Sequence, residues 1–166
     1  MLAVVADASP LIYLARLGRF LLLRELHDAV FVPPAVWAEV AIRGEGWPES
    51  RELKAGVSEG WIQIRRPTSD APLGSAAEHL GRADTEAILL ARELRAVLLT
   101  DDAEAREVAE ALSVKVAGTI AVLIRARLEG KIDRLQPVLD QLRTETNFRM
   151  SEAVYTQALR AVAELA

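Results

Sequence analysis

Acidic residues stand at the ends of two short apolar runs, and their types suit the binding of a cation. Asp7 follows residues 4–6, while Asp101 and Asp102 follow residues 97–100. Carboxylate oxygens are the ligands that Mg²⁺ and Mn²⁺ prefer. Two carboxylates about 4 Å apart repel by about 4 kcal/mol at an effective dielectric constant of about 20, so acids that gather need protons or a divalent cation. Such a cation activates water and stabilises a departing phosphodiester oxygen, so the chemistry indicated is metal-dependent phosphodiester hydrolysis.

Two further acids lie on predicted helices. Glu39 is about one turn into a helix predicted over 35–42, at the border of its apolar face. Asp84 opens a helix predicted over 83–95 and shares its apolar stripe. That helix runs antiparallel to the strand after it, so its start lies near the carboxyl end of that strand. Taken alone, Asp7 favours a helix-cap role and Glu39 a solvated surface position, and Asp84 is typical of an acid that complements the helix dipole. Because all of these acids are predicted at the same edge of the sheet, the pattern favours one pocket that they share.

The elements that must position these acids alternate between short strands and helices. Strands are predicted at 3–7, 29–32, 61–64, 96–100 and 114–116. Helices are predicted at 10–26 with a break near Gly18 and an N-cap at Ser9, and at 35–42, 50–58, 83–95, 103–112, 118–128, 133–143 and 151–164, with a loop at 67–75. This alternation predicts an α/β fold, with a mostly parallel sheet of about five strands covered by helices on both faces. Sites in such sheets form at the carboxyl edge, where the acids fall.

Composition narrows the function classes. A chain of 166 residues suggests one domain, and the absence of cysteine excludes disulfides and thiolate metal sites. The two histidines, His27 and His79, are too few for a histidine-rich site. No apolar run reaches the roughly 18 residues of a membrane span, and the first residues lack the basic segment of a signal peptide. We therefore expect a cytoplasmic protein with no membrane partner. The net charge of −4 argues against a general nucleic-acid coat.

Cations are needed if an acidic pocket is to hold phosphates. Arg82 and Arg106 are the first candidates for RNA binding, because each lies a few residues from a proposed acidic ligand. Further candidates are Arg16, Arg43 and the pair Arg65–Arg66. All are equally typical of a solvated surface. Trp47, in a glycine-containing loop, is predicted with equal weight to contact a partner or to fold into the core.

Five segments, in this order and spacing, resemble the PIN domain, the nuclease fold of VapC-type toxins. They are VVADASPLIYLARLG, PPAVWAEV, GRADTEAILLARE, VLLTDDAEAREVA and VKVAGTIAVL, over about residues 3–128. The resemblance is closest to an uncharacterised PIN-like branch. It implies a three-layer α/β/α PIN-like domain over 1–130, and a C-terminal helical extension over 131–166 packed on the same domain. It also implies Mg²⁺ or Mn²⁺ as cofactor and RNA as substrate.

Carried over residue by residue, the resemblance implies a catalytic quartet that binds the metal: Asp7, Glu39, Asp84 and Asp102. Asp101 competes closely with Asp102 for the fourth position, and Glu86 is the implied helper ligand. Ser9 matches a hydroxyl that orients the first acid or a metal-bound water. Thr119 matches a similar supporting role, although an N-cap role at the start of its helix is favoured over it.

The chain departs from the family pattern in two places. Many PIN toxins carry an aromatic residue after the fourth acid, where this sequence reads AEAREVA. The chain also runs on through 131–166, which is a candidate surface for an antitoxin or a second copy.

Three functions are compatible with these patterns. The first is a metal-dependent endoribonuclease, the toxin of a toxin–antitoxin pair, acting as a homodimer or higher oligomer. The alternative is a catalytically silent PIN-fold protein that binds RNA or acts as a scaffold. The third, a receiver-like phosphoacceptor domain, fits less well. Its acceptor Asp should end the middle strand and a Lys the last, whereas the predicted third strand ends at Ile64–Arg65 and the fifth at Val116–Ala117.

Overall fold

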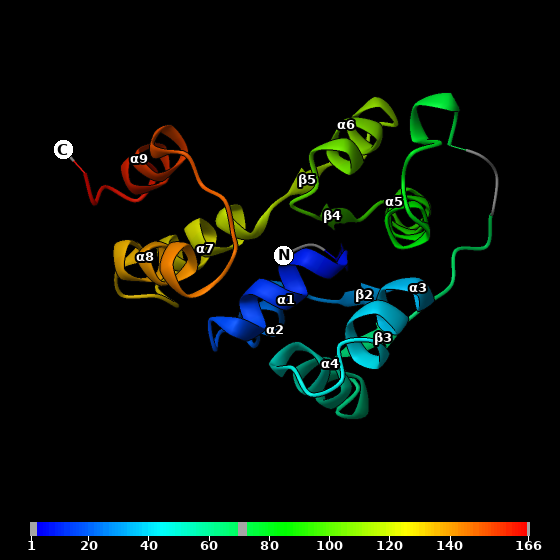
Figure 1. Cartoon of the computed structure of the whole chain (residues 1–166), viewed down its shortest axis with the longest axis horizontal. Coiled ribbons are helices and arrows are strands. Elements are labelled where there is room, and N and C mark those ends of the chain that lie inside the picture. Colours follow the sequence, from blue (N-terminus) through cyan, green and yellow to red (C-terminus); the bar gives the residue numbers. More distant parts are fainter. Residues whose placement is uncertain (1–2, 70–72, 166) are drawn as a thin grey trace.

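A five-stranded parallel sheet forms the centre of the computed structural model, which describes residues 3–69 and 73–165 (Figure 1). Its strands are short: β1 Val4–Ala6, β2 Val30–Val32, β3 Ile62–Ile64, β4 Val97–Leu99 and β5 Val116–Ala117. Their order is β3-β2-β1-β4-β5, which places β1 in the middle, and the pairs are parallel throughout. A receiver-type sheet has the order 2-1-3-4-5, so this topology excludes the receiver-like alternative.

Helices connect the strands at the positions that the sequence pattern predicts. They are α1 Ala8–Arg16, α2 Leu22–Leu26, α3 Pro34–Trp37, η1 Ala38–Ile42, α4 Pro48–Ser58, η2 Ser75–Ala77, α5 Arg82–Leu94, α6 Ala103–Ala111, α7 Thr119–Leu128, α8 Leu135–Glu145 and α9 Glu152–Ala161. The break expected near Gly18 separates α1 from α2, and Gly18 has the positive φ of 70° that glycine adopts most easily. Residues 70–72 of the predicted loop 67–75 lie outside the described residues.

Alternating side chains on the strands divide the interior into two cores. Val4 and Ala6 of β1 belong to a core shared with α1, α2, α4 and α7. Val5, between them, points into the other core, where it meets Phe31 of β2, Leu98 of β4 and the apolar stripes of α5 and α6. The parallel register puts residues of one face opposite each other on neighbouring strands. The fold is therefore the three-layer α/β/α arrangement that the sequence predicts.

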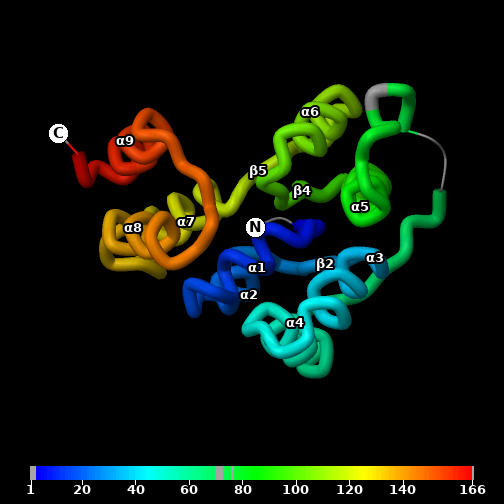
Figure 2. The backbone as a smooth tube through the Cα atoms, viewed as in Figure 1, coloured from blue at the N-terminus to red at the C-terminus, as the bar shows by residue number. Residues whose placement is uncertain are grey.

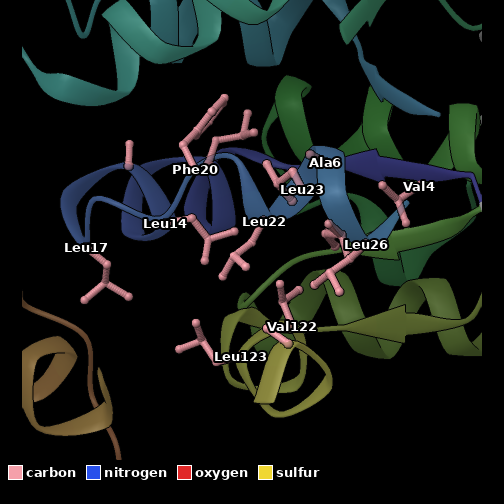
Figure 3. Close-up of a cluster of buried hydrophobic side chains, with 14 of the residues drawn as sticks. Val4, Ala6, Leu14, Leu17, Phe20, Leu22, Leu23, Leu26, Val122 and Leu123 are labelled. Atoms are coloured by element: carbon pink, nitrogen blue, oxygen red, sulfur yellow. The ribbon is translucent and has the colours of Figure 1, made fainter. Parts of the chain in front are cut away.

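Leucine-rich packing fixes the helices on the first face. Figure 3 shows Leu14 of α1, Leu23 and Leu26 of α2, and Val122 and Leu123 of α7 directed into one cluster. The three leucines on α1 and α2 are fully buried, and full burial of one such side chain stabilises a fold by about 1.5–3 kcal/mol. This packing holds α1 rigidly against the sheet, and α1 begins directly after Asp7.

The last two helices pack on the same side. Both contact α7, and their buried residues join the first core: Leu135, Val138, Leu139, Leu142, Ala158 and Leu159. Glu164 reaches back to the start of α8, where its carboxylate accepts the N–H groups of Leu135 at 2.6 Å and Gln136 at 2.8 Å. Arg127 of α7 donates to the same carboxylate at 3.1 Å. In the part of the chain that is described, no helix is long and apolar enough to cross a membrane.

Candidate active site

A cavity of about 1070 Å³ opens at the carboxyl edge of the sheet. Strand order reverses between β1 and β4, and ligands of open α/β sheets bind at such a point. The lining comes from the start of α1, from α3 and η1, from the start of α5, from the end of β4 and from residues 147–149. All of the predicted quartet lines this cavity, together with the competing acid: Asp7, Glu39, Asp84, Asp101 and Asp102.

Asp7 is the buried acid at the floor of the site. Its side chain accepts the Ala8 N–H at 2.8 Å with Oδ1 and the Thr100 hydroxyl at 3.1 Å with Oδ2. Asp7 therefore occupies the N-cap of α1, the position predicted for Ser9. Burial raises the pKa of Asp7 to about 8, and the adjoining Asp84 carboxylate adds to this through a hydrogen bond and through its charge. The Ala8 N–H and the Thr100 hydroxyl act in the opposite direction and lower the pKa. Asp7 thus keeps its proton near neutral pH in the absence of a cation.

Asp101 and Asp102 come after β4 and Thr100 but serve different helices. Asp101 accepts the Thr119 N–H with Oδ1 at 2.7 Å and the Thr119 hydroxyl with Oδ2 at 2.6 Å, so it caps α7 from a neighbouring strand. A Cβ at Gly118 would lie 2.7 Å from Asp101 Oδ1, which explains the glycine before α7. Gly118, and not Thr119, holds the N-cap position, so the N-cap role predicted for Thr119 is wrong.

Asp102 is the N-cap of α6. Its Oδ1 accepts the Ala105 N–H at 3.0 Å. Within residues 3–69 and 73–165, its Oδ2 has no hydrogen-bond donor. Asp102 is also exposed, whereas Asp101 is only partly so. Of the two competitors, Asp102 is the one with an oxygen free to take a ligand.

Glu39 and Ser9 complete the polar lining near the acids. Glu39 lies in η1, a π-helical turn that continues α3, and its side chain is exposed to the cavity. Turns of this kind occur often at functional sites. Ser9 Oγ accepts the N–H of Asp101 at 3.2 Å, so the serine links the start of α1 to the end of β4. This is a supporting contact between the two segments that carry the acids.

Glu86, the implied helper ligand, does not line the cavity. Its Oε1 accepts the backbone N–H of Ala35 at 3.0 Å, and its Oε2 accepts the Nε of Arg82 at 2.9 Å. The carboxylate is therefore fully engaged in joining α5 to the first turn of α3. It supports the site by fixing the helix that leads to Glu39.

Four arginines line the cavity: Arg16, Arg43, Arg82 and Arg149. Glu49 binds two nitrogens of Arg16, which also lies 4.6 Å from the Trp47 ring centroid. Arg82 is bound to Glu86. For Arg43 and Arg149, no carboxylate lies within ion-pair distance among the described residues.

Three of the predicted cations lie elsewhere, since Arg65, Arg66 and Arg106 are not among the lining residues. Arg106 does not line the cavity, and its Nη1 lies 3.7 Å from Glu110 on the same helix. Arg65 lies over the Phe31 ring at 4.8 Å. Trp47 is 56% exposed and does not fold into the core, and the guanidinium of the cavity-lining Arg16 lies over its ring.

Sequence reasoning missed the wall formed by Tyr13, Asn147, Phe148 and Arg149. Residues 147–149 lie between α8 and α9, in the part predicted as an extension. The local signal is weak: a polar, an aromatic and a cationic residue in succession between two amphipathic helices. Only the packing of α8 and α9 on α7 brings these residues to the cavity.

The donor set suits a hard divalent cation. The cavity presents carboxylate and hydroxyl oxygens and no histidine or thiol. Asp7 and Asp84 adjoin each other in the site, and the raised pKa of Asp7 favours a proton whose place a cation would take. Residues 3–69 and 73–165 contain no group of three or more His, Asp or Glu side chains already gathered at ion-binding distance. The Asp7–Asp84 pair therefore fits a metal, and Glu39 and Asp102 line the same cavity as exposed side chains.

Comparison with known families identifies the fold. The family model described as DUF3368, PIN domain, matches residues 3–164. This chain belongs to the PIN-domain family. PIN domains are generally nucleases and typically use divalent metals. The match spans α8 and α9 as well as the sheet, so the PIN model includes the helices that carry the wall at 147–149.

Solved structures similar to this PIN domain include one of low sequence identity. It is a PilT N-terminus domain protein from the hyperthermophilic archaeon Sulfolobus solfataricus P2. The two share 15% identity with a TM-score of 0.48, over 91% of this chain and 100% of that chain. No curated protein matches the chain.

Proposed function

We propose that this protein is a Mg²⁺- or Mn²⁺-dependent endoribonuclease and the toxin of a toxin–antitoxin pair. The observation that carries the proposal is the contact between Asp7 and Asp84 at the carboxyl edge of the sheet, in a cavity that Glu39 and Asp102 also line. Carboxyl groups in contact are costly unless a proton or a cation is shared between them. Membership of the PIN-domain family supports a nuclease-type activity.

Asp7 and Asp84 would hold the cation, with Glu39 and Asp102 exposed in the same cavity. When bound, the cation supplies Lewis acidity and an activated water for attack on phosphorus. The protein's own groups orient the first acid: the Ala8 N–H and the Thr100 hydroxyl hold both oxygens of Asp7. Because Asp7 is only 4% exposed, bulk water is excluded from its inner face. The acid is therefore held in one orientation before substrate arrives.

The test is cleavage of a single-stranded RNA with Mn²⁺, Mg²⁺ or chelator present. Asp7→Asn and Asp84→Asn are expected to lose at least about a hundredfold in rate. Asp133→Asn removes an exposed carboxylate that does not line the cavity, and it should cleave at the wild-type rate. Calorimetric titration with Mn²⁺ gives an independent readout. The proposal is wrong if the wild-type protein binds no Mn²⁺ or if cleavage survives in both site variants.

One observation favours the catalytically silent alternative. Asp101 and Asp102 each cap a helix, and the described residues contain no ready cluster of three acids. A silent RNA-binding or scaffold protein would bind RNA in Mn²⁺ without cleaving it, and Asp7→Asn would leave its RNA affinity unchanged. The cleavage assay and a binding assay on the same variants separate the two functions.

The toxin role rests on the resemblance to VapC-type proteins. Expression of the wild-type protein is expected to arrest growth of a bacterial host, and Asp7→Asn to relieve the arrest. An antitoxin and a second copy of the chain are the proposed protein partners. Growth unaffected by an active nuclease would contradict the toxin role and leave the endoribonuclease proposal standing.

A further inference from the structure

The segment between α8 and α9 returns to the first helix. In Figure 2 the orange stretch after α8 passes beside α1 before the chain enters α9. Its residues Asn147, Phe148 and Arg149 line the same cavity as the acids. The cavity is thus lined partly by residues that lie far along the chain from the acidic motifs.

Contacts on both sides fix this segment. The Tyr13 hydroxyl of α1 donates to Asn147 Oδ1 at 3.0 Å, and the Tyr13 and Phe148 rings meet edge to face with centroids 4.9 Å apart. The Phe148 N–H donates to Thr146 Oγ1 at 3.1 Å, and that hydroxyl donates to the carbonyl of Leu142 in α8. Because α1 begins directly after Asp7, the contacts with Tyr13 fix the position of residues 147–149 relative to Asp7.

The charges of the lining leave an open position for an anion. Five acids line the cavity, and glutamates already bind Arg16 and Arg82. Arg149 is exposed to the cavity, and none of the described carboxylates lies within ion-pair distance of it. An arginine beside an acidic site, without a protein partner, is suited to a phosphate group because its planar fork donates two parallel hydrogen bonds.

We infer that Arg149 binds a backbone phosphate of the RNA strand and that Tyr13 positions it through Asn147 and Phe148. The inference rests on the proposed function insofar as it takes RNA as the substrate. It assigns to α8, α9 and the segment between them a part in substrate binding. Arg149 would offset the repulsion between the acidic lining and the incoming strand.

Binding can be measured apart from cleavage. Fluorescence anisotropy of a labelled single-stranded RNA, in chelator and across a range of KCl concentrations, gives the Kd and its salt dependence. Arg149→Gln is expected to raise the Kd about tenfold and to lower the slope of log K against log salt by about 0.7, the value for one phosphate contact to a single strand. Arg160→Gln, an equal charge change at an exposed position of α9 outside the cavity, should leave both unchanged.

Tyr13→Phe tests the positioning role. The variant keeps the ring contact with Phe148 and removes the hydroxyl that donates to Asn147. A loss of one hydrogen bond is expected to raise the KM about threefold while kcat stays near the wild-type value. A thermal melt equal to that of the wild type shows that the fold is intact. An unchanged KM would contradict the positioning role of Tyr13.

The outcomes separate this inference from the nuclease proposal. If Arg149→Gln keeps the wild-type Kd and salt slope, or if the wild-type protein binds no RNA at low salt, the inference is wrong. If RNA binding depends on Arg149 while Mn²⁺ produces no cleavage, the inference stands and the nuclease proposal fails. Arg149-dependent binding together with cleavage that depends on Asp7 supports both.

Discussion

Asp101 binds Thr119 through both of its carboxylate oxygens, at 2.7 Å to the backbone N–H and at 2.6 Å to the hydroxyl. The aspartate lies two residues after β4 and the threonine begins α7, so this contact joins two parallel strand–helix units at the cavity. It also separates the roles of two adjacent acids, because Asp102 caps α6 and keeps one oxygen free.

Asp101→Ala is therefore expected to reduce stability more than metal binding. The change leaves the first N–H groups of α7 without a capping carboxylate, which costs about 1–3 kcal/mol. Asp102→Asn should do the reverse: the amide oxygen still caps α6, while Mn²⁺ affinity falls. Urea unfolding and Mn²⁺ calorimetry on both variants check this pair. A larger loss of Mn²⁺ affinity in Asp101→Ala than in Asp102→Asn would make Asp101 the fourth ligand.

Asp7→Asn is expected to stabilise the metal-free protein while abolishing metal binding. The asparagine keeps the shape of a buried side chain and removes an ionisable group that lies against Asp84. A gain of about 1 kcal/mol would raise the Tm by about 2–4 °C. Differential scanning calorimetry in chelator measures the gain. Mn²⁺ at about 100 times its Kd should raise the free energy of unfolding of the wild type by about 2–3 kcal/mol and leave that of the variant unchanged.

Glu86→Gln is expected to leave Mn²⁺ affinity close to that of the wild type. The amide oxygen can still accept the Ala35 N–H, and the lost pair with Arg82 involves an arginine side chain that is 77% exposed. Exposed ion pairs contribute about 0–1 kcal/mol. Glu86→Ala, which leaves the Ala35 N–H without its acceptor, should lower stability by about 1–3 kcal/mol. A tenfold or larger loss of Mn²⁺ affinity in Glu86→Gln would restore its helper-ligand role.

His27 gives the fold a pH dependence that is separate from the site. Burial, followed by the charge of Arg125, lowers the pKa of His27 to about 4, and its Nδ1 donates to the Leu23 carbonyl at 3.1 Å. The His27 imidazole is protonated near pH 6.5 in the unfolded chain but only near pH 4 in the folded chain. The contribution of neutral His27 to the free energy of unfolding is therefore complete above about pH 6.5 and is lost as the pH falls toward 4.

The free energy of unfolding should thus be lower by about 2 kcal/mol at about pH 5 than at about pH 7.5 through His27 alone. His27→Gln removes this contribution, so the difference between wild-type and variant pH profiles isolates it from the carboxylates. Urea titrations at the two pH values measure it. Parallel profiles would show that His27 is not the group responsible.

The strand and helix positions were predictable because each strand is a short run of apolar, mostly β-branched residues and each helix has an apolar stripe. The carboxyl-edge location of Asp7 and Asp101 follows from the same alternation. The sequence offers both Asp7 and Ser9 as caps of this helix, and the structure places Asp7 there. The Thr100 hydroxyl after β4, which holds the second oxygen of Asp7, was not predictable because it comes from a segment 93 residues away. The engagement of Glu86 likewise depends on Ala35, which lies on a different helix.

The wall at residues 147–149 was beyond sequence reasoning for a different reason. Its position depends on how α8 and α9 pack on α7 and on the contact between Tyr13 and Asn147, which are 134 residues apart. Local propensity carries no information about a contact of this kind. The segments that resemble the PIN domain end at about residue 128, before this wall.

The pairing of Tyr13 with Asn147 also bears on the order of biosynthesis. Translation proceeds from the amino end, so Asp7, Glu39, Asp84 and Asp102 leave the ribosome well before Asn147 and Arg149. A nascent chain would carry the acids while the wall that faces them is still unmade. The pocket reaches its final form only after most of the polypeptide has been synthesised.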